Sequence, residues 1–331
     1  MNNSPAVALS YDPAGPQFPI SEQCEMPKIT VTATFQNITP DPKIPLQFQW
    51  KVSMVFNGQG CAHSLLRVIK HPDISQVTSS NKFSIPFTQL RGGELTISLS
   101  VAVGSVTLTA QSQNLQVTGT NPSIGALQAG VPPRDGFRKL LRLESGLRQF
   151  LSPTCPLFSG DNLGGVGICQ VTSPAPTDDQ VWSWKENLKA GWQLYQQKEN
   201  AARGYPAHVR QSAEFQALVT AYNNQRSAQA QAGTVAKPLT IELPDYTEEQ
   251  LERDTLRGYN GYAAGLHEYR VKVDGNGLLV VTEDASGTKG TAEWELITAA
   301  ERTAYYDKIN LDTRRRGDPN YVDDVEAKAS F

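Results

Sequence analysis

One glutamate has a residue type and spacing that suit acid–base chemistry. The segment from Leu140 to Phe150 reads LLRLESGLRQF, and Glu144 follows Phe137, Leu140 and Leu141 at the spacing of one helix face. Burial among apolar groups disfavours a charged carboxylate. A carboxylic acid that stays protonated near neutral pH can give its proton to a glycosidic oxygen. The pattern predicts a helix that carries a general acid, Glu144, although a glutamate at the edge of any helix core shows the same spacing.

Four short motifs follow Glu144, and their order is more specific than the glutamate alone. They are GGVGICQ ending at Gln170, NLKAG from Asn187, GYNG around Tyr259 and NYVDDV around Tyr321. Together with Glu-Ser-Gly at 144–146, they resemble the lytic transglycosylases of the soluble Slt type, part of the lysozyme-like superfamily. That family has a Glu-Ser-Gly helix, a Gly-Leu-Met-Gln turn, an Asn-x-x-x-Gly helix, an Ala-Tyr-Asn segment and a late Tyr-Val pair. The resemblance covers about residues 130–331.

Individual positions match this family pattern with few departures. The matching residues are Glu144, Ser145, Gly146, Gly167, Ile168, Gln170, Asn187, Gly191, Tyr259, Asn260, Tyr321 and Val322. Cys169 replaces the methionine of the turn, and Asp161 stands where the family usually has a serine. The family's late glutamate has no clear equivalent, although Asp318 is near. Insertions around 200–250 account for the long interval between the second and fourth motifs.

The resemblance implies cleavage of the glycan strands of peptidoglycan. Glu144 would protonate the oxygen between N-acetylmuramic acid and N-acetylglucosamine. It would then act as a base on the muramoyl 6-hydroxyl, so that a 1,6-anhydro ring closes. This scheme needs one carboxylate, whereas most glycosidases use two. The substrate-binding residues that it implies are Ser145, Asp161, Gln170, Tyr259, Asn260 and Tyr321. No cofactor and no metal are expected.

Two alternatives remain open from the residues. Asp161 opposite Glu144 could activate a water molecule, and the chain would then be a hydrolytic muramidase, that is, a lysozyme. The alternative from another class is a non-enzymatic structural component of a phage or a secretion apparatus. An acid kept on an apolar stripe favours activity over that structural role.

Composition and periodicity predict an α+β protein with two domains. Residues 1–25 are rich in Pro, Ser and Gly, which indicates an irregular leader. Residues 26–120 contain short alternating runs typical of an antiparallel, immunoglobulin-like β-sandwich. This part has no catalytic constellation, so we expect an adaptor or binding domain. Residues 130–331 show helical spacing and return to period two over 268–297, which predicts a mainly α domain with a small β-insertion. The resemblance implies that this domain is lysozyme-like.

Charge and hydropathy exclude several classes of function. A net charge of −3 over 331 residues gives no electrostatic basis for nucleic-acid binding. No run reaches the ~18 apolar residues of a transmembrane helix, and the first residues lack the pattern of a secretory signal. We therefore expect synthesis in the cytoplasm and delivery to the periplasm of a target cell. An antibacterial type VI secretion effector fits best, and a phage wall-degrading enzyme is second. The expected partners are an immunity protein or a component of the secretion or tail apparatus.

The four cysteines lack the spacing of a zinc site. They lie two and two in the halves of the chain, which permits Cys24–Cys61 and Cys155–Cys169 disulfides in an oxidising compartment. Four buried thiols are an equal alternative.

Overall fold

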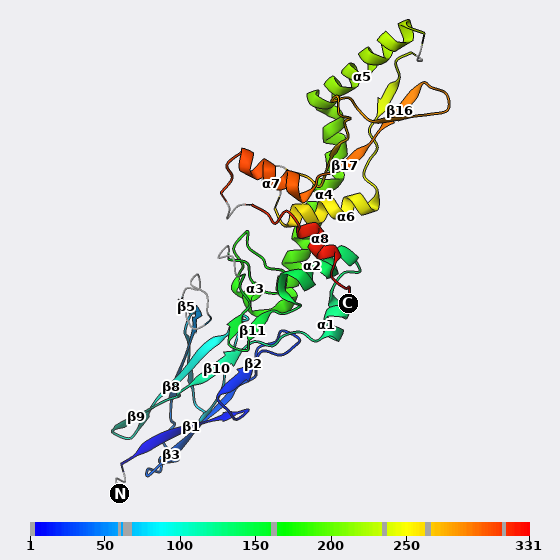
Figure 1. The fold of residues 1–331 in the computed structure, drawn as a ribbon. Helices are drawn as coiled ribbons and strands as arrows, with labels where there is room; N and C mark the ends of the chain where they lie inside the picture. Colours follow the sequence, from blue (N-terminus) through cyan, green and yellow to red (C-terminus); the bar gives the residue numbers. More distant parts are fainter. Residues whose placement is uncertain are drawn as a thin grey trace. The chain divides into compact units, whose positions relative to one another are not determined.

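The computed structural model describes residues 4–58, 61, 68–159, 164–233, 237–261, 266–312 and 316–331. These residues form helices and several β-sheets, which confirms a mixed α+β fold (Figure 1). The chain splits into two compact units. The first holds Met1–Pro133, Glu144–Gly191 and Phe331, and the second holds Arg134–Leu143 and Trp192–Ser330. The region predicted as a lysozyme-like domain, 130–331, therefore has residues in both units.

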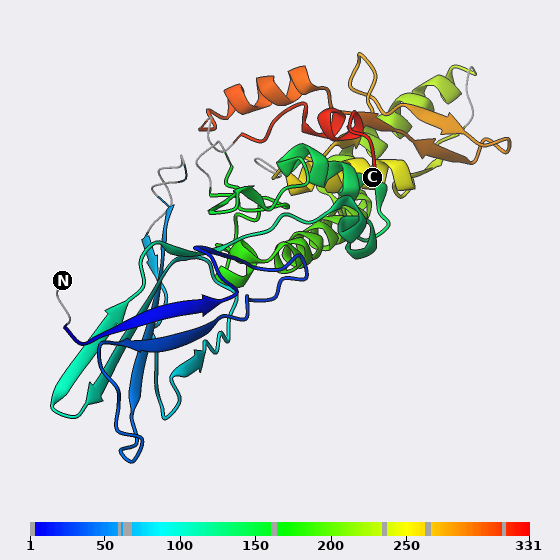
Figure 2. The same cartoon turned by 90° about the horizontal axis from the view of Figure 1, so that it is seen from below.

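Two of the β-sheets in the first unit contain most of its strands. The smaller sheet has the antiparallel order β1 (Ala6–Asp12), β3 (Thr30–Gln36), β7 (Lys82–Ser84), and Figure 2 shows β1 lying along β3. The larger sheet has the order β2 (Gln17–Pro19), β10 (Leu115–Thr118), β8 (Gly93–Val103), β4 (Phe48–Asn57), β5 (Val68–Lys70). In addition, β6 (Ile74–Thr78) pairs with β4, and β9 (Val106–Gln111) pairs with β8. Among the strand pairs described in these two sheets, only β2–β10 is parallel.

The two sheets enclose one core, because their strands alternate buried and exposed side chains. In β4 the alternation runs over the whole strand, so Trp50 and Val52 are buried while their neighbours face outward. The ring of Trp50 stacks on Phe83 of the smaller sheet with centroids 5.4 Å apart. Its indole Nε1 donates to the Thr78 hydroxyl at 2.9 Å, so the buried polar atom is satisfied. The arrangement is therefore a β-sandwich.

Residues 1–25 differ from the prediction of an irregular leader. They supply β1 and β2, which complete both sheets, and Ile20 N donates to Thr118 O at 2.8 Å. The prediction was wrong because proline and serine were given too much weight. Proline is tolerated in an edge strand, and Pro19 lies in the strand at the edge of the larger sheet.

The segment after Glu144 packs on the core of the sandwich. It contains β11 (Phe150–Ser152), β12 (Cys155–Pro156) and α3 (Asp178–Trp182), and it follows α1 (Ile124–Gly130) and α2 (Asp135–Ser145). Phe150 and Trp182 belong to the same apolar cluster as the inner strand residues. The Trp182 ring meets Phe56 edge-on at 5.2 Å. A Cβ at Gly92 would lie 2.2 Å from the Trp182 ring, so only glycine permits this contact.

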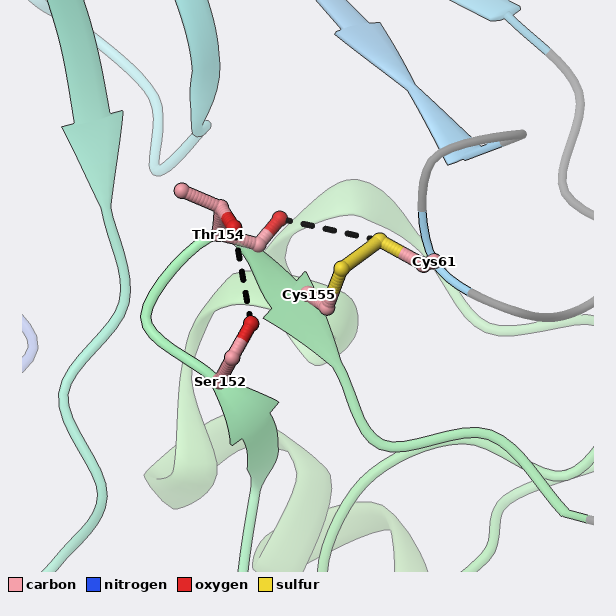
Figure 3. Close-up of a disulfide and its surroundings, with 4 residues drawn as sticks. All are labelled: Cys61, Ser152, Thr154 and Cys155. Carbon is pink, nitrogen blue, oxygen red and sulfur yellow. Dashed lines mark hydrogen bonds between the residues drawn. A yellow bond between two sulfur atoms is a disulfide. The ribbon is translucent and has the colours of Figure 1, made fainter.

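A disulfide joins Cys61 to Cys155 of β12, with the two Cα atoms 5.5 Å apart (Figure 3). The expected Cys24–Cys61 and Cys155–Cys169 pairs are therefore wrong, and so is a set of four thiols. The predicted pairs followed from a division of the cysteines between the two halves of the chain. Instead, the β11–β12 hairpin packs on the sandwich and brings Cys155 to Cys61, while Cys169 is buried elsewhere.

The second unit consists of helices with two small sheets. Its helices are most of α2, the later part of α4 (Trp184–Gln211), α5 (Ala213–Gln231), α6 (Glu248–Tyr259), α7 (Ala299–Lys308) and α8 (Tyr321–Glu326). One sheet has the order β13 (Thr240–Glu242), β16 (Lys289–Ala292), β15 (Val281–Glu283), and the other pairs β14 (Tyr269–Val271) with β17 (Trp294–Leu296). The predicted period-two region over 268–297 therefore does form strands. None of the helices in the described part of the chain is long and apolar enough to cross a membrane.

Candidate active site

Helix α2 places Glu144 in its last turn, as the apolar spacing predicted. Phe137, Leu140 and Leu141 are fully buried, and Glu144 is half-buried at the end of the same stripe. The helix ends at Ser145, because Gly146 and Leu147 both have left-handed backbone conformations, with φ of +59° and +66°. The buried Ser145 hydroxyl accepts a hydrogen bond from Leu147 N at 3.1 Å. Ser145 thus stabilises the helix end that carries the glutamate.

The second motif forms a tight turn. Val166 and Val171 exchange two backbone hydrogen bonds of 3.0 and 3.1 Å across it. Gly167 has a φ of +73°, and a Cβ there would lie 2.4 Å from Gln149 Oε1. Glycine is therefore required at this position by both conformation and space. At the end of the turn, Gln170 has a φ of +49°.

Asn187 holds this turn from helix α4. Its side chain is fully buried, and Oδ1 accepts from Cys169 N at 2.9 Å. Its Nδ2 donates to Val166 O at 2.9 Å and to Gln180 O at 3.1 Å. The third motif matches the family pattern by residue type alone. In the structure its asparagine forms hydrogen bonds with the backbone of the second motif.

Gln149 holds the turn from the other side, and the sequence reasoning missed it. This fully buried side chain accepts from Ile168 N at 3.0 Å. It donates to Gln180 O at 3.0 Å and Val181 O at 2.9 Å. The available signal was a glutamine between Leu147 and Phe150, close after the candidate acid, which is too weak to identify a buried polar residue.

The end of α2, the turn and α4 converge on the Cys169 thiol. Burial raises the pKa of this fully buried thiol well above its usual value, and the negative charge of Glu144 raises it further. A backbone hydrogen bond from Gly191 acts in the opposite direction. The Glu144 carboxylate is thus close enough to the turn to act on it electrostatically, and both lie in the first unit.

Gln170 presents an acceptor at the end of the turn. Its Nε2 donates to Gly167 O at 2.8 Å, which fixes the orientation of the side-chain amide. The Oε1 atom is buried and accepts no hydrogen bond from the residues that the structure describes. A buried carbonyl oxygen costs free energy unless a donor reaches it. The hydroxyl or amide of a ligand is a donor of the required kind.

The two late motifs meet in the second unit. Tyr259 ends α6 half-buried, and Asn260 Nδ2 donates to Asp318 O at 3.1 Å. The buried Tyr321 starts α8, and its backbone N–H donates to the same carbonyl at 3.2 Å. The structure therefore brings Asn260 and Tyr321 to one short segment around Asp318.

A buried carboxylate fixes that segment. Glu268 is fully buried and pairs with Arg253, Arg257 and Arg302 at 3.0–3.1 Å. Arg257 also donates to the carbonyl of Asp318 at 2.8 Å. This network links α6, α7 and the chain before α8, and it therefore positions Asn260 and Tyr321.

Asp161 lies outside the described residues, so the structure does not place this predicted residue. Within the described ranges, no group of three or more His, Cys, Asp or Glu side chains could hold a metal ion. Comparison with known proteins found no matching family model, no matching curated protein and no matching solved structure.

Proposed function

We propose that the chain is a peptidoglycan lytic transglycosylase with Glu144 as its catalytic acid. The observation that carries the proposal is the meeting of three separate motifs in the first unit. Glu144 lies in the last turn of its helix, its charge acts on Cys169 in the turn that ends at Gln170, and Asn187 holds that turn. A turn held by two buried amide side chains is rigid, and preorganisation of this kind is what a catalytic acid and its substrate need.

Cleavage in this proposal needs only the Glu144 carboxyl group. The acid transfers its proton to the oxygen between N-acetylmuramic acid and N-acetylglucosamine as the bond from C1 to that oxygen breaks. The resulting carboxylate accepts the proton of the muramoyl 6-hydroxyl, whose oxygen bonds to C1. The anhydro ring closes, the acid regains its proton, and no water enters the reaction.

Gln170 is proposed to orient the glycan. Its Oε1 is buried and lacks a protein donor among the described residues, and in this proposal glycan binding exposes it to an N-acetyl N–H or a hydroxyl of the substrate. Ser145 also acts on the helix end, because its buried hydroxyl accepts from Leu147 N, and it stays a predicted substrate residue. Tyr259, Asn260 and Tyr321 stay predicted substrate residues of the second unit.

The test is mass spectrometry of the products released from purified peptidoglycan sacculi. We expect anhydro-muropeptides from the wild type and none from Glu144→Gln. The matched control is Glu186→Gln, because Glu186 is a partly exposed glutamate of α4 in the same unit. Reducing-end products would overturn the anhydro mechanism. They would favour a hydrolytic muramidase in which Asp161 activates the attacking water. No product from a folded wild type would favour a structural component.

The sandwich is proposed to be an immunoglobulin-like adaptor. Support comes from its two mainly antiparallel sheets around one core and from the buried Trp50 in the inner strand β4. Delivery to the periplasm of a target cell as an antibacterial effector, opposed by an immunity protein, belongs to the same proposal. The Cys61–Cys155 disulfide supports an oxidising destination, because such bonds persist mainly outside the cytosol.

A further inference from the structure

The Cys61–Cys155 disulfide is tied to the chain that holds the candidate active site. Cys155 lies in β12, which pairs with β11, and β11 begins directly after Gln149. The other cysteine of the disulfide, Cys61, follows β4 of the sandwich. The disulfide therefore attaches the β11–β12 hairpin to the sandwich, and the chain continues from this hairpin to the 167–170 turn.

Backbone hydrogen bonds continue from the hairpin to the turn. Leu157 N, just after β12, donates to Gln149 O at 2.9 Å. Gly167 N donates to Leu157 O at 2.8 Å. The Gln149 side chain accepts from Ile168 N at 3.0 Å. A displacement of the hairpin therefore reaches the 167–170 turn through two backbone contacts and one buried side chain.

A small molecule can reach the disulfide. Both cysteines line a surface pocket of about 190 Å³, together with Asn57, Thr154 and Gln116. Cys155 is half-buried, and Figure 3 shows it beside Thr154, whose carbonyl oxygen lies 3.8 Å from Cys61 Sγ. Exchange with a thiol or a disulfide in solution requires this kind of access.

We propose that the Cys61–Cys155 disulfide is a redox latch that sets the 167–170 turn. In the forward step, two thiols lose two protons and two electrons to the disulfide of an oxidant such as oxidised glutathione or a thiol oxidase. One S–S bond forms in the protein, one breaks in the oxidant, and two oxidant thiols result. Reduction reverses the step, frees the hairpin and loosens the turn while the sandwich stays folded.

The functional meaning of the latch rests on the proposed peptidoglycan cleavage. A chain reduced in the compartment where it is made would cleave glycan poorly. Oxidation after delivery would switch it on. The buried thiol of Cys169 reports on the turn independently of any activity, because its backbone N–H is held by Asn187 and its side chain is fully buried.

The experiment compares oxidised wild type with Cys61→Ser/Cys155→Ser, using N-ethylmaleimide and peptide mass spectrometry to follow Cys169. We expect Cys169 to react at least about tenfold faster in the double variant, because local opening controls the reactivity of a buried thiol. Cys24→Ser is the matched control, since Cys24 lies outside the disulfide, and it should leave the rate unchanged. Circular dichroism follows the sandwich in the same samples.

An unchanged Cys169 rate in the folded double variant would overturn the latch, and so would unfolding of the whole first unit. Glycan cleavage is measured on the same samples and should fall with the faster rate. If Cys169 becomes reactive while oxidised wild type cleaves nothing, the latch stands and the proposed function fails. If cleavage is strong and equal in both proteins, the function stands and the latch fails.

Discussion

Replacing Asn187 by alanine removes the side chain that links α4 to the 166–170 turn. Three hydrogen bonds disappear, to Cys169 N, Val166 O and Gln180 O. The two carbonyls keep another donor each, because Val171 N also donates to Val166 O and Gln149 Nε2 to Gln180 O. Only the N–H of Cys169 loses its acceptor.

The magnitude follows from this count. Each net hydrogen bond contributes about 1 kcal/mol, so Asn187→Ala should lower the free energy of unfolding of the first unit by about 3 kcal/mol. Asn187→Asp keeps the shape and the acceptor for Cys169 N, but it places a carboxylate oxygen against the Val166 and Gln180 carbonyls. It should therefore be at least as destabilising, because a buried charge with Cys169 N as its one donor is costly.

The assay is urea unfolding followed by tryptophan fluorescence, with amide exchange of the peptide containing Ile168 and Cys169. Lys189→Ala is the control on the same helix, since the Lys189 side chain is 65% exposed, and it should change stability by no more than about 0.5 kcal/mol. A loss below about 1 kcal/mol for Asn187→Ala, or a neutral Asn187→Asp, would refute the reasoning, because either result means that the amide does not hold the turn.

Three further outcomes are expected. Gly167→Ala should lower the melting temperature far more than Gly164→Ala, because both residues are left-handed but only Gly167 lacks space for a Cβ; differential scanning calorimetry checks this. Glu268→Gln should destabilise the second unit by about 3–5 kcal/mol, since it leaves buried arginines unpaired, whereas the exposed Glu249→Gln should be nearly neutral in thermal unfolding. Burial lowers the pKa of His71, so the folded chain binds fewer protons than the unfolded chain. The urea midpoint should therefore fall as the pH drops below about 6.5, and this pH dependence should be weaker in His71→Gln.

Contrary results would be informative in each case. Equal melting temperatures for the two alanine variants would mean that the turn moves to accept a side chain. A neutral Glu268→Gln would show that solvent reaches the arginine network. A pH dependence that survives His71→Gln would assign the acid sensitivity to other groups.

Local patterns allowed the sequence to predict the parts of the site that depend on one element. The stripe of Leu140 and Leu141 leads to Glu144 because helical spacing is a property of neighbouring residues. The same holds for the alternation in β4 and β8. Asn187 was found through its spacing from Gly191, although its contact with the turn could not be read from the chain.

Features that depend on distant contacts were missed. Nothing local marks Gln149 as buried, because its partners lie in the turn and in α3. The pairing of Cys61 with Cys155 likewise depends on Phe150 and Trp182 packing into the sandwich. A division of the chain by composition alone therefore separates residues that share one core.

That shared core has a consequence for synthesis of the chain on the ribosome. The first unit is discontinuous, and Trp182 is made long after the sandwich strands. Ribosomes add roughly 5–20 residues per second, so the emerging strands wait for the residues that cap their core. Contacts between segments far apart in sequence also slow folding. Arrival of the segment 144–191 therefore sets when the nascent sandwich becomes stable, and until then its open core is a surface for chaperones.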